Sequence, residues 1–410
     1  MSQTSRALSP FGTTIFATMS RLALEHDAVN LAQGFPDFDG PAFIKQAAKD
    51  AIDHQPNQYA PMPGLPALRK AIAARFAADT GVACDPDAQV VVTSGCTEAV
   101  AAAMLGLCEP GDEVVLFEPF YDSYRACVAM AGAVPRYVPL RPRYESGPNG
   151  QRRIASFDFD PAELAAAFVP LRAGARTRAV LVNTPHNPTG KVFSRAELAQ
   201  IAALCVRHNA LALSDEVYER LLFEPGTHPH IPLATLPGMA ERTLTLSSLG
   251  KTFSLTGWKV GWAVGPEVLV AAVRAAHQFL TFSVPTPLQH AAAVALTREG
   301  EAVPALLATL REGRDALAGA LEALGFVVHV PAGTYFICAD HTAVSARLGV
   351  SGDQAFVLEL IKRCRVAAIP PSVFYNDTSL GTSLVRFAFC KRAETIAEGI
   401  KRLQALGDRR

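Results

Sequence analysis

The sequence predicts an α/β protein: a large domain with a mostly parallel seven-stranded sheet covered by helices, and a smaller α+β domain. Three observations lead to this prediction. Between residues 89 and 264, short apolar runs rich in β-branched residues alternate with Ala- and Leu-rich segments of helical period. Such runs are typical of strands buried on both faces, and their alternation with helices favours parallel pairing. Half of the 410 residues are hydrophobic, which is enough to build a large core.

Local signals in the sequence place each element of the large domain. The seven expected strands are the apolar runs at residues 90–93, 113–117, 136–139, 179–183, 210–213, 243–247 and 261–264. Helical periodicity predicts helices at residues 98–107, 121–131, 194–208 and 266–280. Ser194, followed three positions later by Glu197, has the spacing of a capping box, so the third of these helices is expected to begin there.

The chain beyond residue 285 has a different pattern. After Pro285 and Pro287, a long helical pattern covers about residues 288–324. Residues 326–330, 335–339, 356–364 and 384–389 form a mixture of expected strands and helices. We therefore expect residues 40–285 to form the large domain, and residues 1–39 with 286–410 to form the small one. Residues 141–153, which contain Pro, Gly and scattered charges, are expected to form a surface loop.

Charge and composition exclude several classes of protein. The 38 Lys and Arg residues balance the 38 Asp and Glu residues, so the chain lacks the positive charge of a protein that binds nucleic acid or anionic membranes. No apolar stretch is long enough to span a bilayer, and the N-terminus lacks a signal-peptide pattern. We expect a cytoplasmic protein without nucleic-acid or membrane partners. The eight cysteines have no C-x-x-C spacing, which favours buried free thiols over disulfides or a metal site.

The densest group of polar and glycine residues surrounds Lys251. Its Gly-Lys-Thr core suggests a phosphate-binding P-loop, but that motif needs a glycine five positions before Gly250, where Thr245 stands. Lys251 instead follows an apolar strand, where partial desolvation disfavours the ammonium form and leaves a nucleophilic amine. Such a lysine can form a Schiff base. The alternative for this segment alone is a surface lysine in a Gly/Ser turn.

Three other motifs follow predicted strands of the same sheet. Asp215 and Tyr218 come after one strand, and a segment with two prolines, Asn183 to Gly190, comes after another. Residues 93–98 lead from a strand into a helix whose free N–H groups suit an anion. Each motif alone is compatible with an ordinary turn. Together they predict a ligand site at the carboxyl ends of the strands, where open α/β sheets bind their ligands.

In these motifs the sequence resembles the fold-type I pyridoxal-phosphate (PLP) enzymes, and within them the class I/II aminotransferases. The resemblance covers nearly the whole chain, and the Lys251 segment is its most specific part. The kynurenine/methionine aminotransferase group is the most similar, because of the Asn-Leu-Ala-Gln-Gly-Phe-Pro-Asp-Phe run at residues 30–38 and the Asn-Gln-Tyr at residues 57–59. Bacterial N-succinyldiaminopimelate aminotransferases are similar as well.

The resemblance implies that the large domain binds PLP and gives roles to individual residues. Lys251 would bind the cofactor covalently and then move the proton of the substrate α-carbon. Asp215 would accept the N–H of the pyridinium ring, which keeps the ring an electron sink. Tyr218 and Asn187 would donate to the phenolate oxygen of the ring. Tyr121 would stack on the ring; a core aromatic is the alternative for this residue.

The resemblance also implies which residues bind the phosphate of the cofactor and the substrate. The phosphate would be held by backbone amides and polar side chains, namely Gly95, Cys96, Thr97, Ser248 and Lys259, the last of which is often Arg in the family. Tyr59 would reach the phosphate in a neighbouring subunit, which implies a homodimer with composite sites. Arg386, the lone charge in an apolar strand, would bind the substrate α-carboxylate together with Gly34 and Asn187. A structural salt bridge is the alternative for Arg386.

The substrate side chain is expected to meet aromatic residues, namely Phe35, Tyr121, Tyr375 and, from the partner subunit, Phe282. These residues favour an aminotransferase that moves the amino group of an apolar or aromatic amino acid, such as methionine, kynurenine or phenylalanine, to a 2-oxo acid. N-succinyl-LL-diaminopimelate is an alternative substrate that needs a distal cation, such as Arg125 or one from the partner. A cysteine-S-conjugate β-lyase would use the same residues. A non-catalytic role is disfavoured, because every catalytic position is present.

Overall fold

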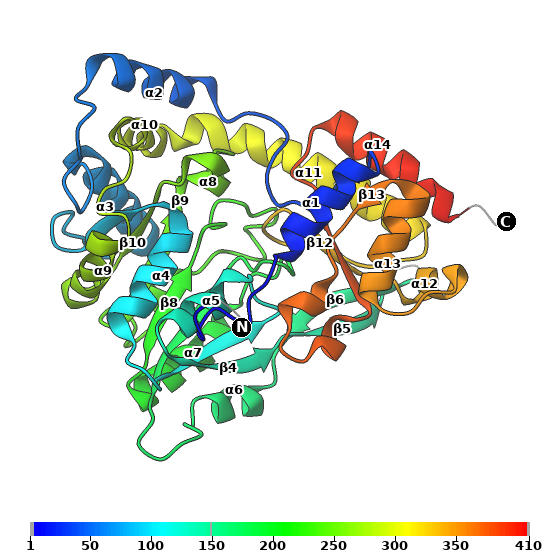
Figure 1. The fold of residues 1–410 in the computed structure, drawn as a ribbon, viewed down its shortest axis with the longest axis horizontal. Coiled ribbons are helices and arrows are strands. Elements are labelled where there is room, and N and C mark those ends of the chain that lie inside the picture. The colour runs from blue at the N-terminus through cyan, green and yellow to red at the C-terminus, as the bar shows by residue number, and fades with distance from the viewer. Residues whose placement is uncertain (1–3, 148–149, 408–410) are drawn as a thin grey trace.

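The computed structural model describes residues 4–147 and 150–407, and its core is a seven-stranded sheet in the order β2-β10-β9-β8-β7-β3-β4 (Figure 1). The strands are β2 (Val90–Thr93), β3 (Glu113–Glu118), β4 (Val134–Pro139), β7 (Thr177–Asn183), β8 (Leu211–Asp215), β9 (Thr243–Ser248) and β10 (Gly261–Val264). Strand β10 runs antiparallel to both of its neighbours, β2 and β9, and the other adjacent pairs of this sheet are parallel. The predicted mostly parallel seven-stranded sheet is therefore confirmed, with strand ends within two residues of those expected.

The central strands of the sheet are buried on both faces, because apolar side chains alternate to the two sides along them. In β3, Val114 and Leu116 pack into the core on one face, whereas Val115 and Phe117 pack on the other, as the two-residue period of a strand requires. The core on the first face includes residues of α4 (Gly95–Leu107), α5 (Ser123–Met130) and α9 (Glu267–Leu280). The core on the opposite face includes residues of α2 (Ala42–His54), α3 (Pro66–Thr80), α6 (Pro161–Ala167), α7 (Arg195–His208) and α10 (Thr286–Thr297).

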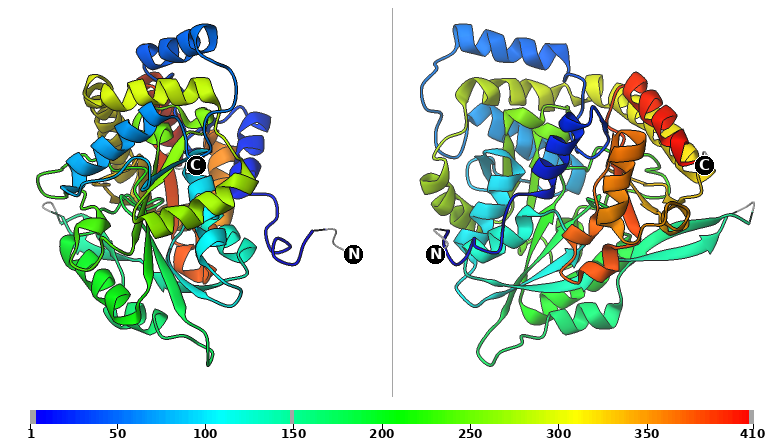
Figure 2. Two further views of the ribbon diagram at one scale, coloured as in Figure 1. Left: turned by 90° about the vertical axis from the view of Figure 1, so that its left-hand side faces the viewer. Right: turned by 45° about the vertical axis from the view of Figure 1, so that its right-hand side comes forward.

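The C-terminal part of the chain forms a smaller α+β unit. Its antiparallel sheet has the order β11-β12-β14, from β11 (Val327–His329), β12 (Phe336–Asp340) and β14 (Leu384–Ala388). The helices are α11 (Glu299–Ala323), α12 (Thr342–Leu348), α13 (Asp353–Glu359) and α14 (Ala393–Leu403). The N-terminal strand β1 (Val29–Asn30) pairs with β13 (Val366–Ala367), so helix α1 (Ile15–Glu25) lies beside this unit (Figure 2). Residues from both ends of the sequence therefore meet in one place.

Two predictions about the chain path are wrong. Residues 141–153 were expected to form a loop, but they belong largely to an antiparallel hairpin of β5 (Arg141–Ser146) and β6 (Arg152–Asp158), which extends from the body of the molecule (Figure 2). Most of its charged residues are exposed, while Ile154 and Phe157 are buried, so burial of a few apolar side chains outweighs the polar composition. The single long helix expected over residues 288–324 is divided at Arg298, which has φ −118° and ψ 25° between α10 and α11.

Local predictions from single residues are confirmed. Ser194 caps α7, with its hydroxyl accepting from the backbone N–H of Glu197 while the Glu197 carboxylate accepts from that of Ser194. The cysteines are free thiols; Cys84 is half-buried and the other seven are buried. Within residues 4–147 and 150–407, no helix is long and apolar enough to cross a membrane.

Candidate active site

A cavity of about 350 Å³ opens where the central strands β7, β8 and β9 end, within the size range of small-molecule sites. Thirteen residues expected from the sequence to form the site line it, namely Gly34, Phe35, Gly95, Cys96, Thr97, Tyr121, Asn187, Asp215, Tyr218, Ser248, Lys251, Lys259 and Arg386. They come from segments far apart in the chain, because the parallel strands deliver their carboxyl ends to one edge of the sheet.

Lys251 lies on the short helix α8 (Leu249–Thr252), directly after β9. Its Nζ donates to the hydroxyl of Tyr335 at 2.8 Å and to the carbonyl of Gly34 at 3.3 Å. Burial lowers the pKa of this amine to about 8, against an ordinary value of 10.5. At pH 7 about a tenth of Lys251 is therefore neutral, far more than for an ordinary lysine, and this is the form that attacks a carbonyl carbon and takes up a proton.

Asp215 ends β8 and is held by several hydrogen-bond donors. The phenol of Tyr124 donates to Oδ2 at 2.6 Å, and the backbone N–H of Val217 donates to Oδ1 at 3.2 Å. Burial raises the pKa of this carboxyl, while Tyr124, Val217 and then Cys96 act in the opposite direction. A carboxylate stabilised in this way inside an apolar wall is suited to bind a cationic ring N–H.

The start of α4 has the geometry of an anion site. Gly95 has a φ of +75°, and a Cβ atom there would lie 3.1 Å from the ammonium of Lys259. A Cβ on Gly261 would lie 2.5 Å from the carbonyl carbon of Gly95, so the absence of both side chains allows these segments to approach closely. The Lys259 ammonium lies 3.5 Å from the hydroxyl of Thr97. Free N–H groups at a helix start beside a lysine are suited to a phosphate.

Arg386, on β14, is a buried cation that has neutral partners. Its guanidinium donates to the carbonyl of Ala32 at 2.8 Å and to the side-chain oxygen of Asn187 at 3.1 Å, and it lies 4.1 Å from the centre of the Phe336 ring. Its Nε is buried without a partner, and no carboxylate in the described part of the chain lies within ion-pair distance. Burial lowers the pKa of Arg386 to about 10, so it stays a cation at neutral pH. Such a group is suited to bind the carboxylate of a substrate.

Two expected site residues, Tyr59 and Phe282, lie away from the cavity of their own protomer. Their rings meet edge to face at 5.4 Å, and the side chains are exposed to solvent, Tyr59 to 84%.

Two residues expected near the substrate do not line the cavity either. Tyr375 is buried elsewhere, with its hydroxyl donating to the carbonyl of Leu140 at 3.2 Å, so its expected place in the pocket is wrong. Arg125 stacks on Phe120, 5.5 Å from the ring centre.

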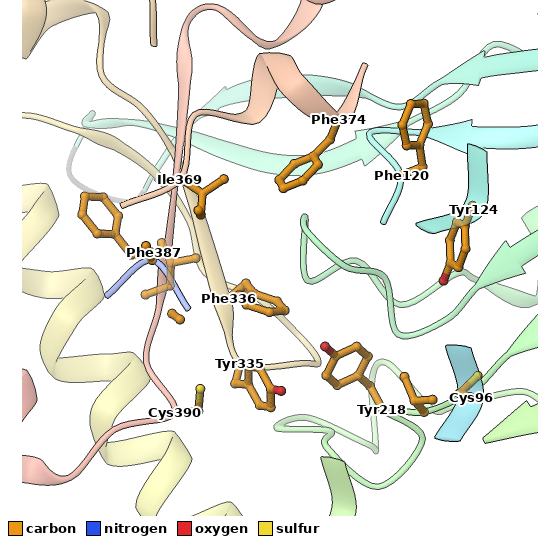
Figure 3. Packing of buried hydrophobic residues seen from close by; sticks show 14 of the residues in the cluster. Cys96, Phe120, Tyr124, Tyr218, Tyr335, Phe336, Ile369, Phe374, Phe387 and Cys390 are labelled. Carbon is orange, nitrogen blue, oxygen red and sulfur yellow. The ribbon is translucent and has the colours of Figure 1, made fainter. Parts of the chain in front are cut away.

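Several cavity residues had no role from the sequence. They are Phe16, Gln33, Tyr124 and Phe336, which line the cavity, and Tyr335, which contacts Lys251. Tyr124 lies one helical turn after Tyr121 in the predicted helix, and this spacing is a signal that it shares a face with the expected ring-stacking residue. In Figure 3 the hydroxyls of Tyr218 and Tyr335 are turned toward each other beside Phe336. Only the folded chain shows that Tyr335 meets the lysine.

The chain matches a known family over most of its length. Residues 26–403 fit the model of aminotransferase class I and II. The chain belongs to this family. A probable N-succinyldiaminopimelate aminotransferase, DapC, of Mycobacterium tuberculosis (strain ATCC 25618 / H37Rv) is 49% identical to it over 410 residues, covering 98% of each chain. The methionine aminotransferase of Escherichia coli (strain K12) is 40% identical over 399 residues, covering 97% of each. Kynurenine–oxoglutarate transaminase 1 of Homo sapiens is 39% identical over 397 residues, covering 92% of each.

Solved structures lead to the same family. The N-succinyldiaminopimelate aminotransferase from Mycobacterium tuberculosis superposes with a TM-score of 0.90 at 49% identity, covering 98% of this chain and 100% of that one. The predicted family and fold class are confirmed. The chain is a PLP-dependent aminotransferase, and the cavity fits this cofactor, because it offers a buried carboxylate, a buried lysine and a phosphate-sized donor set around one space.

Proposed function

We propose that this aminotransferase moves the amino group of an apolar or aromatic L-amino acid, of the methionine, kynurenine or phenylalanine type, to a 2-oxo acid. The observation that carries the proposal concerns the cavity lining, which combines several aromatic side chains with one cation that is left to bind a substrate carboxylate. Besides Lys251 and Lys259, Arg386 is the cation among the described residues that line the cavity, and Phe16, Phe35, Tyr121 and Phe336 line it too. The relatives named methionine aminotransferase and kynurenine–oxoglutarate transaminase support this choice.

In this proposal each polar residue of the cavity has a task. PLP, when bound, supplies an electron sink for the pair of electrons left at the substrate α-carbon. Lys251 would take the proton from that carbon and return it to the cofactor carbon C4′. Asp215 holds the ring N–H, while Tyr218 and Asn187 donate to the ring oxygen and Tyr121 stacks on the ring. The phosphate is held by Gly95, Cys96, Thr97, Ser248 and Lys259.

Arg386 holds the substrate α-carboxylate in a two-point contact, supported by Gly34 and Asn187. The oxygen of the Asn187 side chain already accepts from Arg386, so its amide nitrogen is the donor that serves the ligand. A second carboxylate at the far end of the substrate would lie against the aromatic wall. Leaving that carboxylate unpaired there costs several kcal/mol of binding free energy. This cost is enough to make a dicarboxylate a poor amino donor.

A second candidate substrate is N-succinyl-LL-diaminopimelate, which the 49% identity to the Mycobacterium tuberculosis relative favours. Its distal carboxylates need a cation. Among the described residues, those that line the cavity offer only Lys251, Lys259 and Arg386, each of which already has a task. This candidate therefore requires a cation from a partner subunit or a movement of Arg125.

We also propose that the enzyme is a homodimer in which Tyr59 and Phe282 of one subunit complete the site of the other. Both are exposed aromatics whose rings contact each other, and Phe279, three positions before Phe282 in the chain, is 85% exposed. Exposed large apolar side chains of this kind support an interface. In this proposal residues 40–285 form one domain, which carries Lys251 and Asp215. Residues 1–39 and 286–410 form the other, which carries Gly34 and Arg386.

A panel of amino donors, tested with 2-oxoglutarate and pyruvate as acceptors, decides between the substrates. We expect kcat/KM for methionine, kynurenine or phenylalanine to exceed that for aspartate by at least about tenfold, which is about 1.4 kcal/mol of transition-state binding. Higher kcat/KM for N-succinyl-LL-diaminopimelate than for the apolar donors would establish the second candidate. Release of ammonia and pyruvate from a cysteine S-conjugate measures β-lyase activity at the same site.

A further inference from the structure

We infer that Tyr335 is a positioning residue for Lys251: its phenol oxygen orients the amine so that the lone pair of the neutral form faces the cavity. The inference rests on the proposed role of Lys251 as the group that moves the proton. Tyr335 is 1% exposed, and its oxygen is 2.8 Å from Nζ of Lys251. A buried phenol this close to the reacting amine determines where the hydrogens of that amine point.

The directions of the hydrogen bonds follow from the count of donors. Tyr335 has one O–H, and it donates that hydrogen to the carbonyl of Gly34 at 2.6 Å. Toward Lys251 the phenol oxygen is therefore an acceptor, as is the carbonyl of Gly34 at 3.3 Å from Nζ. A neutral amine has two N–H groups, and these two acceptors take both. The lone pair is left in the remaining tetrahedral direction, away from Tyr335 and Gly34 and toward the cavity that Lys251 lines.

The backbone holds Tyr335 in this position. Thr334, just before it, has a φ of +67°, a conformation that a β-branched residue rarely adopts. The turn is anchored, because the N–H of Thr334 donates to the carbonyl of Leu221 at 3.0 Å and its hydroxyl oxygen accepts from the N–H of Phe336 at 3.3 Å. Strain of this kind persists only where the surroundings impose it, and it gathers at functional sites. The ring of Tyr335 is also fixed edge to face against Tyr218 at 5.3 Å.

The other ionisable groups around Lys251 come from several elements. They are Asp215 from β8, Tyr218 after it, Lys259 before β10, Arg386 from β14 and Cys390 after it. Asp215 favours the ammonium form of Lys251, whereas Lys259 and Arg386 disfavour it. The phenol oxygen of Tyr335, as a direct acceptor, also stabilises the ammonium form more than the neutral one. Removing that oxygen is therefore expected to lower the pKa of Lys251 further.

The test compares Tyr335→Phe with Tyr375→Phe. Both substitutions remove a buried phenol that donates to a backbone carbonyl, but the Tyr375 hydroxyl serves Leu140 outside the cavity. In the cofactor-free protein, the pH dependence of Lys251 acylation by acetic anhydride, followed on its peptide by mass spectrometry, gives the pKa of the amine. We expect Tyr335→Phe to lower this pKa by about one unit and Tyr375→Phe to leave it unchanged.

In the PLP-loaded enzyme, we expect Tyr335→Phe to lower kcat for methionine at least about tenfold, while KM changes less than about threefold. The reason is that Lys251 loses its orientation, whereas the contacts of the substrate are unchanged. An unchanged acylation pKa or an unchanged kcat in folded Tyr335→Phe overturns the inference. If this variant does not fold, Tyr335→Met, which also lacks the hydroxyl, takes its place. Multiple turnover by Lys251→Ala would instead overturn the proposed role of Lys251, independently of Tyr335.

Discussion

The phenol of Tyr124 donates a hydrogen bond to Oδ2 of Asp215 at 2.6 Å, and both side chains are buried. Asp215 would otherwise depend on one backbone N–H and the thiol of Cys96 for stabilisation. Burial raises the pKa of Asp215, and the hydrogen bond from Tyr124 acts in the opposite direction, which favours the carboxylate form. The contact thus links a residue of α5 to the proposed partner of the cofactor ring.

The first prediction concerns Tyr124→Phe. Loss of the hydroxyl raises the pKa of Asp215 further, so a larger fraction is protonated and cannot accept the ring N–H. We expect the dissociation constant for PLP to rise and kcat to fall, each about tenfold at pH 7. The gap from wild type should widen as the pH falls, because protonation of Asp215 increases in that direction. Fluorescence titration with PLP and a pH–rate profile measure both effects.

Tyr144→Phe is the matched control for this prediction. The Tyr144 hydroxyl also donates to a carboxylate, that of Asp340 at 2.7 Å, but neither residue lines the cavity. We expect its PLP affinity and kcat to stay within about twofold of wild type. Equal losses in the two variants would mean that Tyr124 supports the fold and has no particular effect on Asp215.

The sequence predicted the strands of the central sheet well, because each is a short apolar run bounded by Gly, Pro or polar residues. It predicted the location of the candidate site for a related reason: residues at the carboxyl ends of parallel strands meet at one edge, as Asp215 and Lys251 do. Most of the individual site residues came from the resemblance to the aminotransferases. The β5–β6 hairpin was missed, since a two-stranded ribbon needs only a few buried residues, such as Ile154 and Phe157, to offset its polar composition.

The contacts that sequence reasoning missed depend on tertiary structure. Tyr335 reaches Lys251 across 84 residues of sequence, through a turn at Thr334 in a conformation that no local propensity favours. Tyr375 was expected in the pocket, but the short 3₁₀ turn before it, Pro371–Phe374, leads the ring toward Leu140. A hydroxyl in an apolar segment indicates that a buried partner exists, but only the fold identifies the partner.

The second prediction is that Lys251→Met stabilises the cofactor-free protein at neutral pH. In the folded protein Lys251 has a pKa of about 8, against 10.5 ordinarily, so between these values the unfolded chain binds more protons. The free energy of unfolding of wild type therefore rises with pH through that window, and the cost of burying the ammonium is fully present below pH 8. Methionine has similar size and no charge. We expect it to add up to about 3 kcal/mol at pH 7.

Urea denaturation of the cofactor-free proteins between pH 6 and 9 measures this difference. The advantage of Lys251→Met should shrink above pH 8, because wild type itself gains stability there. Lys45→Met, which removes an exposed lysine paired with Asp39, should show no comparable gain. A pH-independent difference between Lys251→Met and wild type would mean that packing, and not ionisation, causes it.

The third prediction concerns the carboxylate contact of Arg386. Arg386→Lys keeps a charge but loses the two-point geometry, so we expect kcat/KM for methionine to fall at least about a hundredfold, mainly through KM. Arg386→Gln should lose more, because the buried substrate carboxylate then has no counter-charge. Arg125→Gln is the control, since Arg125 stacks on Phe120 away from the cavity. If Arg125→Gln impairs methionine turnover as strongly as Arg386→Lys, the carboxylate contact is misassigned.

The last prediction concerns the proposed sharing of sites between subunits. Tyr59 lies away from the cavity of its own protomer and is 84% exposed, so its proposed task is at the site of the partner. In a heterodimer of Tyr59→Phe and Lys251→Ala subunits, one site then has both changes. The other site joins an intact Lys251 to an intact Tyr59 from the partner. We expect activity to rise above the mean of the two parent homodimers after the subunits are exchanged.

As a control, Tyr144→Phe replaces Tyr59→Phe in the same mixture with Lys251→Ala, and no gain is expected because neither subunit restores the other. If the Tyr59→Phe mixture also stays at the parental mean after exchange is verified by mass spectrometry, each subunit completes its own site.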